Sequence, residues 1–304
     1  MSRERPLEPI ETLIICGIGL TAGFFGALAG LGGSLFMLPL LSILLGHERY
    51  HLFMAAAMCV NVMISLPAAY RHWRKGATRF RTLVWVLPTM IPAIAAGVLL
   101  SNRFDGVYLA RTLGVLIMLS ILIQLILPKL VGKQAKAPNS DEPTAEPEDR
   151  SLRTPYQKFG MSGIGGITGF ISGLMGIGGG VVLVSGGQIV GGLPIRRAIA
   201  NSSAAICITA AIGGFLKVAT IGEHGFSITE PLALAAIMGA WGVLGAIAGV
   251  EAVHLVPQRI LRWVVGLVLI LAALRLATTP SNGGEDSDIS PSAQVLQMFT
   301  PTSG

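Results

Sequence analysis

Two glycine-rich sequences are the features of this chain best suited to binding a ligand. They are Gly30-Leu-Gly-Gly-Ser34 and Gly176-Ile-Gly-Gly-Gly180, and each lies between a long apolar segment and a short one. Glycine allows backbone conformations that are closed to other residues. A helix that begins directly after such a junction presents unpaired N–H groups and the positive end of its dipole, which bind an anion without a charged side chain.

The paired positions of the two junctions favour a transport site. Short helices at corresponding places in two halves of a membrane protein mark the binding site of many transporters. Close helix packing is the alternative role, because Gly26-x-x-x-Gly30 and Gly169-x-x-x-Gly173 have the spacing of a packing motif. The junction residues that we expect to contact the substrate are Gly30, Gly32, Gly33, Ser34, Gly176, Gly178, Gly179 and Gly180.

Polar side chains within the apolar segments supply further candidates. Asn61 lies in the first half of the chain, and Asn201 and Ser202 begin a polar run in the second. Such groups are costly in hydrocarbon and usually face the interior of a helix bundle. We expect these three to donate hydrogen bonds to an oxyanion, and hydrogen bonding between helices is the alternative. Arg71 and Lys217 end the third apolar segment of each half and either attract an anion or extend to the membrane surface.

Acidic residues and histidine are missing from the centre of every apolar segment. A proton relay or an acidic cation pore would place such residues there. Catalysis would require a base, a nucleophile or a metal cluster, and the three cysteines (Cys16, Cys59 and Cys207) are isolated from one another. The sequence therefore predicts neither an enzyme nor a bound metal or other cofactor.

The composition predicts an integral membrane protein. Hydrophobic residues make up 52% of the 304 positions and charged residues only 12%, against about a quarter in soluble domains. Long windows lack any charged residue or histidine, and most reach the length of about 20 residues that spans the hydrocarbon core. Lipid offers no hydrogen-bond partners, and the stretch 113–122 is apolar on all sides, so we predict an all-α polytopic helical bundle and not a barrel. The windows are 12–46, 52–70, 82–102, 159–195, 198–216 and 231–250.

A polar, proline-rich stretch divides the membrane part into two. Its composition is typical of a flexible linker, and the end of the chain has a similar composition. The predicted divisions are a first membrane repeat at 8–128, a disordered cytoplasmic linker at 129–158, a second membrane repeat at 159–277 and a disordered tail at 278–304.

The two membrane parts resemble each other at a fixed offset. Adding 146 takes Gly23 to Gly169 and Gly30 to Gly176, and the same register continues without a gap to Gly76. A fixed offset of this kind is the signature of an internal repeat. We therefore interpret the chain as two sequence-related halves.

Each half contains five apolar segments, and the second of them is short. At 13 residues, or about 20 Å as a helix, the short segment fits a half-helix or a re-entrant piece. Five crossings per half would invert the repeats and four would leave them parallel, so we predict 8–10 transmembrane helices. Both models place 15 lysines and arginines inside and 7 outside, with the Arg71–Arg81 loop and the linker in the cytoplasm. The segments are about 10–30, 34–46, 52–70, 82–101 and 107–127, then 159–176, 180–192, 198–216, 231–250 and 260–277.

The sequence around the junctions resembles the sulfite exporter TauE/SafE family of membrane transporters. The similarity is carried by Gly23-Phe-Phe-Gly-Ala-Leu-Ala-Gly-Leu-Gly-Gly-Ser-Leu-Phe-Met-Leu-Pro39, by the second copy Gly169-Phe-Ile-Ser-Gly-Leu-Met-Gly-Ile-Gly-Gly-Gly-Val-Val-Leu-Val184, and by the basic Tyr70-Arg-His-Trp-Arg-Lys-Gly76 loop. The resemblance implies an inner-membrane carrier for sulfur-containing anions such as sulfite, sulfoacetate or related organosulfonates. Because Cys207 takes the place of Asn61 in the second copy, we do not expect the two halves to contribute identically to a site.

These observations together predict a secondary transporter that exports a small sulfur oxyanion by alternating access, with import as the other direction. A membrane scaffold without transport activity and an anion channel are the alternatives. The expected partners are the lipid bilayer and a small anionic substrate, and a homo-oligomer stays open. The net charge of +6 lies in short loops, which indicates membrane topology and not nucleic-acid binding. We expect a multi-pass protein of the cell inner membrane.

Overall fold

A computed structural model describes residues 9–29, 32–46, 49–74, 76–131 and 154–252. Every regular element in these ranges is helical, which confirms the predicted all-α fold. The elements are α1 (Pro9–Ala29), α2 (Ser34–Leu45), α3 (Tyr50–Arg74), α4 (Phe80–Ser101), α5 (Gly106–Val131), α6 (Pro155–Met175), α7 (Gly180–Ile189), α8 (Ile195–Ala219), the 3-10 helix η1 (Ile221–His224) and α9 (Thr229–Ala252).

Five of the described helices are long and apolar enough to cross a membrane. α6 has the same length as α1, 21 residues, but its many glycines and serines make it less apolar. Large apolar side chains such as Leu13, Val84 and Phe215 are exposed on these helices, as a lipid-facing surface requires. The chain is therefore a multi-pass membrane protein, as predicted. The apolar spans are Ile10–Ala27, Tyr50–Arg74, Phe80–Ser101, Arg197–Ala219 and Thr229–Gly249.

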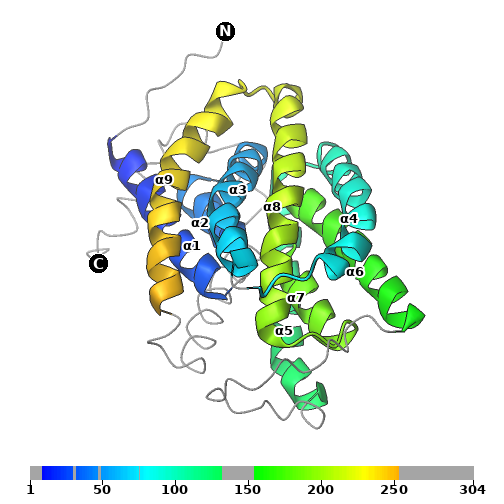
Figure 1. The fold of residues 1–304 in the computed structure, drawn as a ribbon. Helices are drawn as coiled ribbons and strands as arrows, with labels where there is room; N and C mark the ends of the chain where they lie inside the picture. Colours follow the sequence, from blue (N-terminus) through cyan, green and yellow to red (C-terminus); the bar gives the residue numbers. More distant parts are fainter. Residues whose placement is uncertain (1–8, 30–31, 47–48, 75, 132–153, 253–304) are drawn as a thin grey trace, which may run out of the picture.

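α3 and α8 lie side by side at the centre of the bundle (Figure 1). α1 and α9 pack together on one side of this pair, and α4 and α6 pack together on the other. In addition, α9 contacts α3, and α4 contacts α8. Each outer pair joins one helix of the first half to one helix of the second, so the two halves are interleaved.

Helices that correspond in the predicted repeat run in opposite directions. His51, at the start of α3, contacts Lys217, near the end of α8, so these two helices are antiparallel. The backbone contacts of their glycines show that α1 runs parallel to α9 and that α4 runs parallel to α6. This arrangement matches the inverted model with five segments per half, which the loop charges had left open. The repeat itself stays a prediction.

The two ends of the bundle differ in their side chains. α3 ends and α4 begins at one end, which carries Arg74 and Arg79 and which we call the basic end. α3 begins and α8 ends at the other, which carries His51 and Lys217 and which we call the histidine end. Because α6 is parallel to α4, it also starts at the basic end.

α2 and α7 are the short helices predicted after the glycine junctions. α2 has 12 residues and α7 has 10, so they rise only about 18 and 15 Å. Gly33 directly precedes α2, and Gly179 directly precedes α7. Because Ser34 contacts Asn61 in the middle of α3, α2 begins about halfway through the bundle.

α6 begins at Pro155, four residues before the predicted apolar segment. Thr154 accepts a hydrogen bond from the Gln157 N–H, and the Gln157 side chain accepts one from the Thr154 N–H, which forms a capping box. Proline fits the first helical turn because its missing N–H would have no partner there. The helix therefore includes the end of the predicted linker. The last predicted segment, 260–277, and the tail lie outside the described residues.

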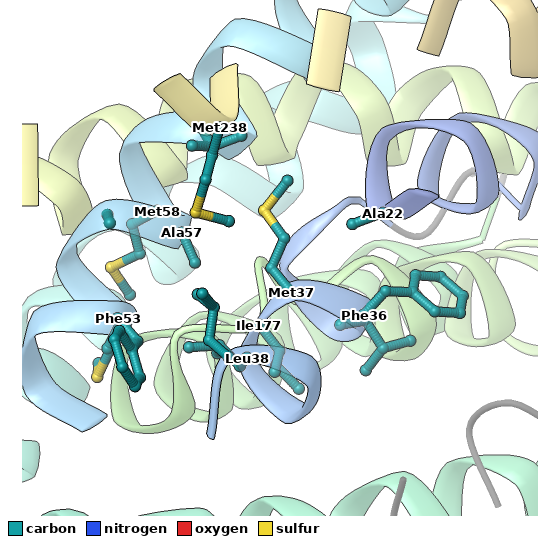
Figure 2. Close-up of a cluster of buried hydrophobic side chains, with 14 of the residues drawn as sticks. Ala22, Phe36, Met37, Leu38, Phe53, Ala57, Met58, Ile177 and Met238 are labelled. Carbon is teal, nitrogen blue, oxygen red and sulfur yellow. The ribbon is translucent and has the colours of Figure 1, made fainter. Parts of the chain in front are cut away.

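The largest buried cluster lies where α2 packs against α3 and α9. Met37, Met58 and Met238 come from these three helices and are at most 1% exposed. Figure 2 shows Met37 and Met238 directed toward each other, with Leu38 beside Ile177 of the second junction. Flexible thioether side chains fill irregular space well. Both halves therefore contribute to one core around the short helix α2.

Glycines bring the helix backbones into contact in both outer pairs. A Cβ added at Gly23 of α1 would lie 2.0 Å from the carbonyl oxygen of Gly242 of α9. One added at Gly169 of α6 would lie 2.3 Å from the carbonyl oxygen of Met90 of α4. Small residues allow membrane helices this close an approach. The packing role that the sequence offered as an alternative therefore applies to these glycines.

We expect Gly23→Ala to force α1 away from α9 and to lower the free energy of unfolding by about 1–3 kcal/mol. Gly17→Ala is the matched control on the same helix, because no atom lies within 4 Å of its added Cβ. Alanine favours helix more than glycine does, so the control should be neutral or stabilising. Thermal unfolding of the purified protein in detergent measures both variants. Equal losses in the two would contradict the packing role.

Candidate substrate-binding site

Asn61 joins the two glycine junctions in the middle of the bundle. Its Oδ1 accepts a hydrogen bond from the Ser34 N–H at 3.0 Å, and its Nδ2 donates to Ser34 Oγ at 2.7 Å. It thereby supplies an acceptor to a backbone donor at the start of α2 that has no partner within the helix. A Cβ added at Gly32 would lie 3.4 Å from Oδ1, and one added at Gly178 would lie 2.8 Å from Nδ2. The structure therefore brings four predicted site residues together.

The two glycines beside Asn61 both need the left-handed backbone region. Gly32 has a φ of 86° and Gly178 a φ of 72°, which side chains with a Cβ rarely adopt. Gly33, by contrast, has an ordinary helical φ of −73°. At Gly178 a side chain would also enter the space that the Asn61 amide occupies. Glycine is therefore required at Gly32 for its backbone conformation, and at Gly178 for both its conformation and its small size.

The second junction differs from the first in its polar neighbours. Thr168 and Ser172 of α6 lie against Gly179, whose added Cβ would be 2.4 Å from Thr168 Cγ2 and 3.3 Å from Ser172 Cβ. Both hydroxyls are buried, and neither has a hydrogen-bond partner within the part of the chain that the structure describes. Unpaired buried hydroxyls are rare and call for a water, an ion or a ligand. Sequence reasoning missed both residues, although they lie one helical turn apart directly before the junction.

α7 begins without a capping side chain. Gly179 precedes the helix and offers no side-chain acceptor to its first N–H groups. In the predicted repeat, the position of Asn61 corresponds to Cys207, whose thiol is only a weak acceptor. The positive end of α7 therefore lies beside the side chains of Thr168 and Ser172, of which the methyl carbon Cγ2 and Cβ are the nearest side-chain atoms to Gly179. This combination of donors suits a small oxyanion.

Asn201 and Ser202 are neighbours in sequence but have different surroundings. Ser202 Oγ lies 3.5 Å from the carbonyl oxygen of Gly180, at the second junction. Asn201 Oδ1 instead accepts a hydrogen bond from the Arg79 N–H at 2.8 Å, at the start of α4 and near the basic end. Successive residues on an α-helix point about 100° apart, since 3.6 residues complete a turn. Of the two, the structure brings only Ser202 to the junctions.

Gly176 and Gly180 mark the helix ends on either side of the second junction. Gly176 follows α6 with a φ of 77°, and its N–H donates to the Ser172 carbonyl oxygen at 2.8 Å. Gly180 is the first residue of α7. Gly30 lies outside the described residues. Apart from the half-buried Gly32, the described members of the predicted site are all buried, so the junctions are closed to solvent in this conformation.

A second polar cluster, at the histidine end, was not predicted. Lys217 donates hydrogen bonds to His51 Nδ1 at 2.9 Å, to Ser101 Oγ at 3.0 Å and to Asn102 Oδ1 at 2.5 Å. The ring of His224 stacks on that of His51 with 3.6 Å between the centroids. One of the two roles expected for Lys217 was to extend to the membrane surface. Lys217 is fully buried, so it does not do this. Its partners lie 115 to 166 residues away in sequence, so no local pattern pointed to the cluster.

Comparisons with known proteins connect this arrangement to membrane transport. The family model described as "Sulfite exporter TauE/SafE" matches residues 15–276. Two relatives carry the name "Probable membrane transporter protein MamO". The protein of Magnetospirillum gryphiswaldense is 24% identical over 87% of this chain and 45% of its own length. That of Paramagnetospirillum magneticum is 24% identical over 86% of this chain and 44% of its own length.

A third relative comes from an archaeon. "Probable membrane transporter protein MJ0441" of Methanocaldococcus jannaschii is 23% identical over 69% of this chain and 73% of its own length. The chain thus spans less than half the length of the two MamO proteins and most of the archaeal one. No solved structure matches the chain significantly.

We expect Asn61→Leu to lower the free energy of unfolding by about 1–3 kcal/mol, because it leaves the buried Ser34 N–H without an acceptor. Ser34→Ala is the matched variant, since it removes the hydroxyl but keeps the backbone N–H bonded to Asn61. Its loss should be smaller, about 0.5–1.5 kcal/mol. Thermal unfolding in detergent compares the two. A larger loss in Ser34→Ala would show that Asn61 does not cap α2.

Proposed function

The chain belongs to the sulfite exporter TauE/SafE family, and we propose that it exports a small sulfur-containing anion, sulfite or an organosulfonate, by alternating access. Its family, its relatives and its apolar helices make it a membrane transporter. We choose an anion because the buried hydroxyls of Thr168 and Ser172 have no partner among the described residues and because the start of α7, beside these residues, is uncapped. The substrate and the direction are our inference.

The second junction suits this substrate because it offers donors without a full positive charge. A sulfite or sulfonate group presents three oxygens that accept hydrogen bonds. The first N–H groups of α7 are donors, and the neighbouring residues Thr168 and Ser172 each carry an unpaired hydroxyl that can donate as well. At the first junction the Asn61 amide is already engaged by Ser34. We therefore assign the anion to the second junction, with the first as its structural support.

The way the helices are grouped supports the proposal of alternating access. α1 and α9 contact each other through glycine backbones, and α3 packs on α9; we call these three the α1–α3–α9 group. α4 and α6 are in the same kind of contact, and α8 packs on α4; these form the α4–α6–α8 group. The buried junctions lie where Asn61 of α3 meets Gly178. Movement of one group against the other at the α3–α8 interface would open the site toward either end.

A scaffold and a channel are the competing functions. The glycines at Gly23 and Gly169 do serve helix packing, as a scaffold would require. Buried hydroxyls without partners also occur elsewhere among the described residues, at Ser42, Thr78 and Thr82. Those of Thr168 and Ser172, however, belong to residues beside a glycine junction and the uncapped start of α7, and this combination favours a bound anion there. A channel would give single-channel currents in a planar bilayer, whereas a carrier gives none. Neither the fold nor the site calls for an enzymatic activity, and we propose none.

We also propose that the protein lies in the cell inner membrane with its basic end in the cytoplasm. Arg71, Arg74, Arg79 and Arg81 gather at this end, and positive residues favour the cytoplasmic side. The lipid bilayer and the small anion are its proposed partners, and the basic residues need no nucleic acid to explain them.

We expect Gly178→Ala to reduce sulfite flux at least tenfold in proteoliposomes, because its Cβ would displace the Asn61 amide at the meeting of the junctions. Gly192→Ala is the matched control. It has a left-handed φ of 63°, so it carries a similar backbone strain of about 1–2 kcal/mol. Its added Cβ, however, would meet only the Gln157 side chain at 3.9 Å. Unchanged flux in well-inserted Gly178→Ala protein would overturn the site.

We expect Thr168→Val to weaken the apparent affinity for sulfite about tenfold or more, because a hydrogen bond to a charged group contributes about 1.5–3 kcal/mol. Valine keeps the shape of threonine and removes the hydroxyl. Thr209→Val is the matched control, since Thr209 is equally buried but donates to the Ala205 carbonyl oxygen at 2.8 Å. The concentration dependence of flux gives the affinity. Equal weakening in both variants would remove Thr168 from the site.

A further inference from the structure

Lys217 is a buried cation within a membrane-spanning helix. Its side chain is 0% exposed, although α8 ends only two residues later at the histidine end. An ionisable residue in such a place is costly to bury and usually has a function. The proposed anion site lies at the glycine junctions and makes no use of it.

The Lys217 ammonium group has three neutral hydrogen-bond acceptors. Two of them, Ser101 Oγ and Asn102 Oδ1, lie at the end of α4, which packs against α8 within the α4–α6–α8 group. The third, His51 Nδ1, belongs to α3. Each N–H donor of the ammonium therefore has one acceptor. Only the bond to His51 crosses to the α1–α3–α9 group.

Lys217 and His51 share a single positive charge. His51 Nε2 lies 3.0 Å from the carbonyl oxygen of Phe104, which can only accept, so this ring nitrogen carries the proton. Nδ1 is then the nitrogen with the lone pair, and it accepts from Lys217. A second proton on the ring would place two like charges 2.9 Å apart in a buried site. The pair therefore titrates as one unit and exchanges one proton.

Water has a route to His51. A cavity of about 260 Å³ lies at the histidine end and is lined in part by His51, Asn102 and His224. This volume is large enough for several water molecules, and its polar lining offers them hydrogen bonds. Lys217 does not line this cavity, so its proton reaches the solution at this end by way of the His51 ring, without crossing the membrane.

The other charged and titratable groups that face the pair come from two segments. Arg103 and Asp105 lie between α4 and α5, and Glu223 and His224 lie in η1. Burial lowers the pKa of His224, the Lys217 charge lowers it further, and Glu223 opposes the shift. His224 is therefore neutral over most of the range from pH 6 to pH 9, so its own titration contributes little there.

We propose that Lys217 and His51 form a proton-binding site that controls the opening of the histidine end. With the proton bound, the ammonium group donates to His51 and holds α3 against α8. When the proton leaves for the water of the cavity, the amine keeps two N–H donors for three acceptors, and the bond to His51 is lost. Only the consequence, a transport cycle that depends on pH, rests on the proposed function.

Cys59 is a built-in reporter of this contact. It lies about two turns from His51 on α3, and its Sγ is 3.5 Å from a Cβ added at Gly214 of α8. With Cys16→Ala and Cys207→Ala, it is the one remaining thiol of the chain. Cys59 is half-buried in this conformation, and a charged, membrane-impermeant methanethiosulfonate labels it faster when α3 and α8 separate. Labelling rates are measured in proteoliposomes and divided by the rate for Lys217→Gln at the same pH, which removes the titration of the thiol itself.

At pH 6 we expect this protein to label about tenfold more slowly than Lys217→Gln, from the loss of a charge-assisted hydrogen bond, and at pH 9 to approach its rate. Lys217→Arg keeps its charge at every pH used, so it should label slowly at both. Arg103→Gln removes a charge from the cavity without touching Lys217 and should behave like the unsubstituted protein. A ratio that does not change with pH, or slow labelling of Lys217→Gln, would overturn the proposal.

Two features of the experiment ensure that every outcome is informative. If Lys217→Gln does not fold, the comparison with Lys217→Arg at pH 6 and pH 9 decides alone, because both proteins then carry a side chain of similar length. Labelling needs no substrate, so it is separate from the flux experiments. Protein that labels as expected but carries no sulfite would contradict the proposed function and leave the proton site standing.

Discussion

A helix that starts inside a membrane must obtain acceptors for its first N–H groups from the protein, because lipid supplies none. α2 and α7 both start in this way, directly after a glycine junction. At α2 the Asn61 side chain supplies an acceptor to the Ser34 N–H. At α7 no side chain among the described residues does, and within the same part of the chain the hydroxyls of Thr168 and Ser172 have no partner. One requirement thus connects the capped first junction with the uncapped second junction, to which we assign the anion.

The helices around the junctions are closely packed. Glycine backbones in contact tie α1 to α9 and α4 to α6, so each outer pair contains one helix from each half of the chain. The units that move in our proposed mechanism are therefore not the two halves in sequence order. They are two interleaved groups that meet along α3 and α8, where the junctions and the Lys217 cluster both lie (Figure 1).

Sequence reasoning was most successful where the membrane itself restricts the answer. Apolar windows predicted the helices, and glycine positions predicted the two short ones among them. Apart from a closed barrel, helix is the one structure that satisfies its own backbone hydrogen bonds in lipid. Sequence reasoning failed to choose between inverted and parallel halves, because the charges of the loops count equally in both. It grouped Asn201 with Ser202 because they are adjacent, although helix geometry turns them to different neighbours.

Contacts between distant parts of the chain were beyond sequence reasoning. Lys217 and His51 lie 166 residues apart, and each by itself reads as an ordinary residue near a helix end. Thr168 and Ser172 stand in a helix full of small residues, where hydroxyls usually bond to their own backbone. Whether these hydroxyls find a partner depends on the packed structure, so the spacing of residues in the sequence does not reveal it.

The difference between Asn61 and Cys207 has a consequence for the energy of the transport cycle. In an inverted pair of halves, the two access states are related by exchanging the conformations of the halves, and identical halves would make them equally populated. Here only the first junction has the asparagine–serine pair that fixes its short helix. The exchange is then between unlike partners, so the two states differ in free energy. For the alternating access that we propose, this single side-chain difference predicts a preferred resting orientation and unequal rates for the two directions of transport.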